Sequence, residues 1–93
     1  MQAWRSFRRA MGRLHDGLQQ PEVLALLGPP DLVHDGDAKA GIDFSWEYHE
    51  RLPEHRDLIV NFAGGAVCCS TLRHIPDAQQ RHEFRKHGHP YSA

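Results

Sequence analysis

Residues 42–49, IDFSWEYH, alternate between apolar and polar side chains with a period of two. Successive side chains of a β-strand point to opposite faces, so this alternation predicts a strand with one buried and one polar face. The inward set is Ile42, Phe44, Trp46 and Tyr48, and each large ring contributes about 2–3 kcal/mol when it is buried. A chain with this strand must therefore build an antiparallel sheet and cover its aromatic face.

Two further strands follow the first along the chain. Leu58, Val60 and Phe62 alternate in a second strand, and the pair Gly64–Gly65 predicts a tight hairpin into a third strand, AVCCSTL, at 66–72. We therefore predict a three-stranded antiparallel meander over residues 42–72. In a regular strand the neighbours Cys68 and Cys69 would point to opposite faces, so we expect two free thiols and no disulfide.

The segment before the sheet, residues 1–32, predicts a pair of helices. Apolar residues at spacings of three and four form one stripe of a first helix: Trp4, Phe7, Met11, Leu14 and Leu18. This helix is expected to end at Gly17 or at Gln19–Gln20, because Pro21 suits the first turn of the next helix. The second helix should end at Gly28, which two prolines follow.

The remaining segments complete a single domain over residues 1–93. Residues 33–41 are rich in turn-forming residues and lack an apolar period, so they predict a flexible loop. Residues 77–88 predict a short polar helix, and residues 89–93 a flexible tail. The predicted fold class is α+β, with two N-terminal helices packed on a three-stranded antiparallel sheet and a short peripheral C-terminal helix.

The order and spacing of these features resemble those of a known family. A helix stop, an aromatic pair one residue apart and an apolar strand joined to a glycine hairpin follow one another within residues 15–72: Leu27, Gly28, Pro30, Asp31, Trp46, Tyr48, Ile59 to Phe62, Gly65 and Val67. This pattern resembles the small ααβββ domain of the SmpA/OmlA lipoproteins and is similar to the units of β-lactamase inhibitor protein. The resemblance implies protein binding without catalysis. A lipid-attachment cysteine near the N-terminus is absent, so the lipoprotein role is not carried over.

With the aromatic side buried, the opposite side of the predicted sheet is the candidate partner surface. It carries polar side chains around one isoleucine: Ser45, Glu47, His49, Ile59 and Asn61. We predict a non-catalytic protein–protein interaction module that binds through this sheet face or through an exposed sheet edge. The expected partner is another protein, which could be a second copy of this chain.

The alternative hypothesis is a small nucleic-acid-associated protein. Four arginines lie on the polar side of the first predicted helix, where their guanidinium groups could contact phosphates: Arg5, Arg8, Arg9 and Arg13. Residues 21–62, with nine acids against three bases, and a pI of about 6.7 argue against this hypothesis.

Nothing in the sequence predicts an enzyme, a metal site or a cofactor. Cys68 and Cys69 lack the CxxC spacing of zinc sites, and no Cys–His pair has the arrangement of a nucleophile with its base. No apolar run approaches the roughly 20 residues needed to span a bilayer, and arginines interrupt any apolar leader at the N-terminus. Two free thiols suit a reducing compartment, so we expect a cytoplasmic protein that is not in a membrane.

Overall fold

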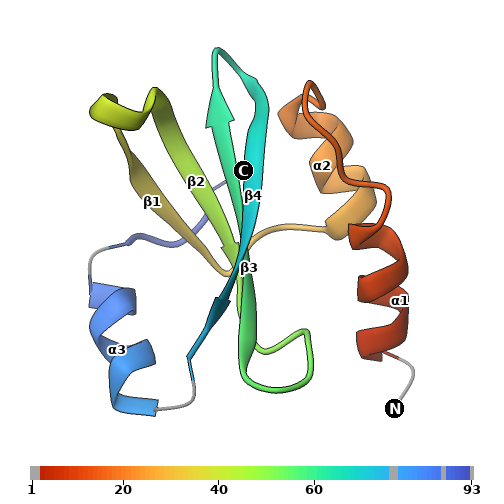
Figure 1. The fold of residues 1–93 in the computed structure, drawn as a ribbon, viewed down its shortest axis with the longest axis vertical. Helices are drawn as coiled ribbons and strands as arrows, with labels where there is room; N and C mark the ends of the chain where they lie inside the picture. Colours follow the sequence, from red (N-terminus) through yellow and green to blue (C-terminus); the bar gives the residue numbers. More distant parts are fainter. Residues whose placement is uncertain (1–2, 76–77, 87, 93) are drawn as a thin grey trace.

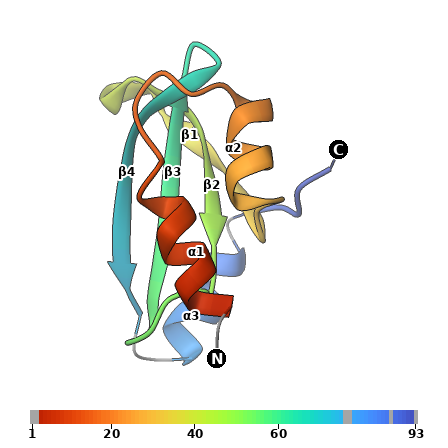
Figure 2. The ribbon, with the colours of Figure 1, turned by 90° about the vertical axis from the view of Figure 1, so that its right-hand side faces the viewer.

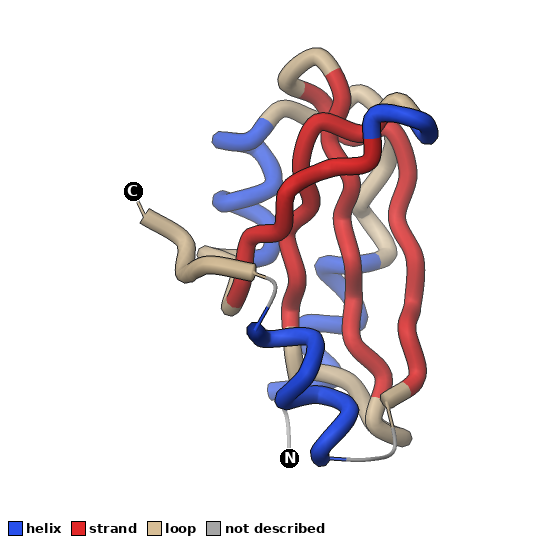
Figure 3. The backbone as a smooth tube through the Cα atoms, turned by 90° about the vertical axis from the view of Figure 1, so that its left-hand side faces the viewer, coloured by secondary structure: helices blue, strands red, loops and turns tan. Residues whose placement is uncertain are grey.

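A four-stranded antiparallel sheet lies between two layers of helix in this α+β protein (Figure 1). The structure, a computed structural model, describes residues 3–75, 78–86 and 88–92. The strands are adjacent in chain order: β1 (Leu32–Asp37), β2 (Ile42–Tyr48), β3 (Arg56–Ala63) and β4 (Ala66–His74). Helices α1 (Ala3–Met11) and α2 (Gln20–Leu27) cover one face, and α3 (Ala78–Lys86) lies on the other (Figures 2 and 3).

The predicted three-stranded sheet and the predicted loop over 33–41 are both wrong, because this segment forms a fourth strand. β1 pairs with β2 from Leu32 opposite Glu47 to Asp37 opposite Ile42, and a single 3₁₀ turn, η1 (Ala38–Ala40), joins the two strands. The end of β1 lies at a sheet edge and is exposed, so its side chains are polar and show no alternation. Gly36 is needed there, since a Cβ would collide with the carbonyl oxygen of Ile42.

The inward orientation of Trp46 and Tyr48 is confirmed, since both side chains are buried. The Phe62 ring lies 4.8 Å from the Phe44 ring and 4.8 Å from the Trp46 ring, measured between centroids. Phe7 of α1 packs 5.7 Å from the Tyr48 ring, and buried residues of α2 join the same cluster. The two N-terminal helices therefore cover the aromatic face as the alternation requires.

The first helix is shorter than predicted and ends at Met11. The chain then passes along the start of β4, where the Gly17 N–H donates to the Val67 carbonyl and the Val67 N–H donates to the Leu18 carbonyl, both at 2.8 Å. A helix continued to residue 18 could not make the first of these bonds, because the Gly17 N–H would donate within the helix. Leu14 and Leu18 still pack against the core from this turn, whereas the Trp4 side chain lies outside the described part.

The helix stop at residues 27–31 is tied to the end of β2. The Tyr48 hydroxyl donates to the Gly28 carbonyl at 2.8 Å, and the Asp31 carboxylate accepts from the His49 N–H at 2.7 Å. Burial raises the pKa of Tyr48, so the hydroxyl stays protonated and can donate. Gly28 has a φ of 82°, which favours glycine. The stop therefore fixes the angle between α2 and the sheet and belongs to the scaffold.

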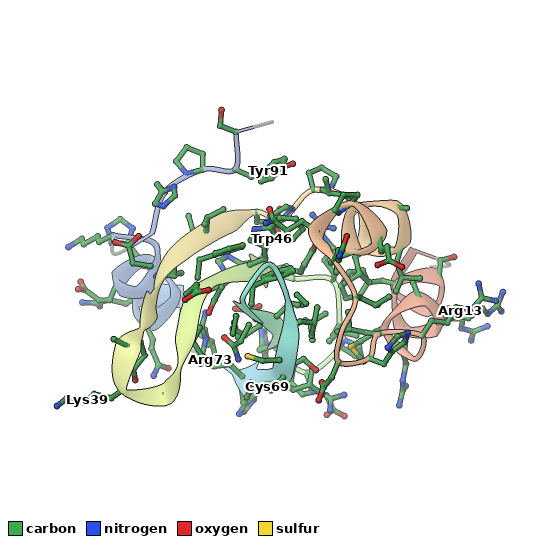
Figure 4. The ribbon with its side chains drawn as sticks, turned by 90° about the horizontal axis from the view of Figure 1, so that it is seen from above. Arg13, Lys39, Trp46, Cys69, Arg73 and Tyr91 are labelled. Carbon is green, nitrogen blue, oxygen red and sulfur yellow. The ribbon has the colours of Figure 1, made fainter. Side chains whose placement is uncertain are left out.

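The segment after α3, for which we predicted a flexible tail over 89–93, runs across the outer edge of β1 in the described residues 88–92. His89 and Val33 exchange backbone hydrogen bonds of 2.7 and 2.8 Å across the outer edge of β1. Tyr91 then packs edge-on against Trp46, with 5.4 Å between ring centroids (Figure 4). An apolar ring and a free strand edge therefore hold this segment. Asp77, the predicted N-cap of the last helix, lies outside the described residues.

Candidate functional site

The predicted partner surface on the sheet is buried, and the expectation of an open face is wrong. Ser45, Glu47, His49 and Asn61 are buried, and only Ile59 is partly exposed. Two features explain the burial. α3 lies on this side of the sheet (Figure 3), with Gly88 directly against the side chains of Leu32 and His34, and the polar side chains bond to one another.

Glu47 is the centre of a polar network that connects three strands. Its side chain is only 4 % exposed. Arg73 of β4 donates to both carboxylate oxygens, at 2.7 and 3.2 Å, and therefore reaches across β3 to β2. The Nε2 atoms of His49 and His34 lie 2.8 and 3.0 Å from the carboxylate oxygens. The carboxylate is thus surrounded by nitrogen groups.

These partners keep Glu47 ionised. Burial alone would raise the pKa of Glu47, but the hydrogen bonds from His49 and Arg73 and the charge of Arg73 hold it below its usual value. Asp57 is a second, fully buried carboxylate in the network; it accepts from the Glu50 N–H at 3.3 Å and lies 3.7 Å from Arg73 Nη2. Both carboxylates are engaged in contacts within the fold. The network therefore stabilises the pairing of the strands.

A separate chain of hydrogen bonds runs from the buried face to the two cysteines. The Ser45 hydroxyl donates to Asn61 Oδ1, and Asn61 Nδ2 donates to Cys69 Sγ at 3.3 Å. A β-bulge between Asn61 and Phe62 brings the sulfurs of Cys68 and Cys69 to 3.8 Å, so the expected separation onto opposite faces is wrong. Desolvation and the neighbouring Cys69 thiol raise the pKa of Cys68.

The outer edge of β4 is exposed beyond its start, where Gly17 and Leu18 bond to Val67. Residues 69–72 are all exposed, and among the described residues Leu72 is the one exposed large hydrophobic residue, at 42 %. The Ile75 N–H donates to the His55 carbonyl, so the alternation of antiparallel pairing points the backbone groups of Ser70 and Leu72 outward. Within residues 3–75, 78–86 and 88–92, no segment bonds to these outward groups. At the other end of the sheet, His89 pairs with β1.

The four predicted phosphate-binding arginines are all exposed on the N-terminal segment. Arg5, Arg8 and Arg9 belong to α1, whereas Arg13 lies in the turn after it and points away from the sheet (Figure 4). Arg9 and Arg13 line a shallow groove together with Ala25 and Leu26 of α2. The structure thus brings two of the four arginines to one groove.

Comparisons with protein-family models, with curated proteins and with solved structures found no match. The SmpA/OmlA resemblance therefore stays a prediction from the sequence. Within the described part of the chain, no helix is both long enough and apolar enough to cross a bilayer.

Proposed function

We propose that the protein is a non-catalytic interaction module that binds an extended segment of another protein along the outer edge of β4. The observation that supports this most is the exposed run at residues 69–72, with outward backbone groups at Ser70 and Leu72 and an exposed leucine side chain. An edge strand with unpaired donors and acceptors is a template for an added strand. The polar residues of the sheet face are buried, so we place the partner at the edge of β4.

The fold supports β4 as a rigid template. The side chains of Arg73 in β4 and Glu47 in β2 are bonded across β3. The C-terminal half of β4 is therefore fixed to the centre of the sheet. A rigid edge lowers the entropy cost of pairing with an incoming strand. Side chains of an added strand would alternate between the side of Leu72 and the side of Thr71. A second copy of the chain could supply this strand through its own β4.

Ser70→Pro should weaken partner binding at least about tenfold, since proline removes an outward N–H and its ring blocks a neighbouring strand. The Ser70 N–H is not bonded to β3, so the fold should persist. The measurement uses extended peptides selected from a random library for binding to the wild-type protein, with affinities measured for each variant. Ser70→Ala is the matched control and should bind like wild type.

Amide hydrogen exchange provides a second readout of the same contact. The amides of Ser70 and Leu72 should exchange fast in the free protein and become protected when peptide binds. Peptide binding that leaves these amides unprotected and is insensitive to Ser70→Pro would contradict the edge proposal and place the contact elsewhere.

The exposed arginines support nucleic-acid binding as a second candidate function. Arg9 and Arg13 flank one groove, and both are exposed. If they bind phosphates, the affinity for a single-stranded oligonucleotide should fall steeply between 50 and 200 mM salt, on the order of tenfold or more. Arg9→Glu combined with Arg13→Glu should abolish this binding, whereas Lys39→Glu, at the distant η1 turn, should change it little. Affinity that does not depend on salt would exclude this candidate.

A further inference from the structure

The bulge in β4 places two neighbouring thiols side by side at an exposed edge. Asn61 pairs with Cys69 and Phe62 pairs with Val67, so Cys68 is the extra residue of the bulge. The two sulfurs lie 3.8 Å apart, and Cys69 is exposed while Cys68 is partly exposed. The bulge therefore converts a sequence that would normally separate two thiols into a vicinal dithiol that solvent can reach.

The spacing of the sulfurs suits a single bound atom. Two sulfurs bonded at about 2.3 Å to one centre with tetrahedral angles are about 3.8 Å apart, which is the separation in this protein. A trivalent centre with narrower angles needs the sulfurs slightly closer, and a small rotation of the exposed Cys69 side chain supplies that change. The folded strand thus holds the pair close to the spacing of a chelate.

The hydrogen-bond chain from Ser45 through Asn61 ends at one of the two thiols, Cys69. Because Ser45 donates to Asn61 Oδ1, the amide group of Asn61 is turned so that Nδ2 donates to Cys69 Sγ. This hydrogen bond fixes the position of the Cys69 sulfur, 3.8 Å from the sulfur of Cys68. Ser45 and Asn61 are therefore positioning residues for the Cys69 sulfur.

We infer that Cys68 and Cys69 form a chelating dithiol site for a soft, thiophilic centre, of which trivalent arsenic is the best-suited class. Among the described residues, no group of three potential ligands comes together, and a structural zinc ion takes four protein ligands. A monosubstituted arsenic(III) oxide needs only two. It forms two As–S bonds while both S–H bonds break, and the two protons leave with the oxide oxygen as water, without oxidation or reduction.

Phenylarsine oxide is the probe for this site. One molecule should bind per chain, remove both titratable thiols and raise the thermal midpoint, because the ligand binds the folded site more tightly than the flexible unfolded pair. Cys68→Ser and Cys69→Ser should each weaken binding on the order of 100-fold or more, since the second bond is then lost. An unchanged or lowered midpoint, or reaction of a single thiol, would overturn the inference.

A matched variant tests whether the bulge is responsible. Cys68→Ser with Thr71→Cys keeps two thiols on one face of β4 but separates them by two residues, and it should bind phenylarsine oxide far more weakly than wild type. Equal binding would overturn the inference. For the positioning role, Asn61→Leu should weaken phenylarsine oxide binding relative to wild type; unchanged binding would exclude that role.

Discussion

Glu47→Gln should destabilise the fold by about 3 kcal/mol, which is typical of breaking a buried ion pair from one side. The change keeps the shape of the side chain but removes the charge that Arg73, His49 and His34 face. Arg73 is then left beside a neutral amide, with the Asp57 carboxylate 3.7 Å from its Nη2 atom. The measurement is urea unfolding of both proteins at pH 7, compared at equal m-values.

A double-mutant cycle separates this pair from its surroundings. Arg73→Met removes the other charge, and the double variant with Glu47→Gln should be markedly less destabilised than the sum of the two single variants. Additive effects would contradict a direct pair and indicate that each side chain acts through other contacts. Asp35→Asn, at the fully exposed end of β1, is the control for loss of a carboxylate and should change stability by less than about 0.5 kcal/mol.

The acid stability of the wild-type protein should depend on the same carboxylate. The pKa of Glu47 is lower in the folded state than its usual value of 4.5. Its contribution is therefore fully present above pH 4.5 and is lost as the pH falls through the folded pKa, because the unfolded state takes up the proton first. The Glu47→Gln variant lacks this titratable carboxyl group. The difference in unfolding free energy between the two proteins should therefore shrink on acidification from pH 7 to below pH 4.

The strongest sequence pattern predicted the part of the fold that burial determines. Alternation in residues 42–49 identified β2 and its inward rings, because a one-residue shift would move Trp46 and Tyr48 out of the apolar core. β1 could not be recognised in the same way. Its side chains near Asp35 and Asp37 are exposed at an edge, so backbone pairing alone defines the strand and leaves no hydrophobic period.

The candidate sites could not be predicted from the sequence, because they depend on contacts between strands that are distant in sequence. Glu47 and His49 are polar and alternate with aromatics, which is equally typical of a solvated face. In the fold both are buried, and Glu47 bonds to Arg73, which is distant in sequence. The approach of Cys68 to Cys69 depends on a β-bulge that no residue type in this part of the sequence predicts. The sequence showed two adjacent cysteines after a glycine hairpin. Only the pairing register of β3 and β4 shows that their sulfurs lie side by side.

Trp46→Ala should destabilise the protein by about 4 kcal/mol, a large share of the 5–15 kcal/mol that stabilises an ordinary domain. The ring is 2 % exposed and contacts three other rings, those of Phe44, Phe62 and Tyr91. Its removal leaves a cavity in the middle of the aromatic face and takes away the surface on which Tyr91 rests. Urea unfolding gives the global effect, and exchange of the Val33 and His89 amides, which bond across the edge of β1, gives the local one.

Two comparison variants separate the core from the C-terminal segment. Tyr91→Ala removes only the ring that packs on Trp46 from outside, so it should cost about 1 kcal/mol while speeding exchange of the Val33 and His89 amides as much as Trp46→Ala does. Leu72→Ala, on the exposed edge of β4, should cost less than about 1 kcal/mol. If Tyr91→Ala were instead as destabilising as Trp46→Ala, the docked segment would be part of the cooperative core, because releasing it would then unfold the sheet that Trp46 holds against the helices.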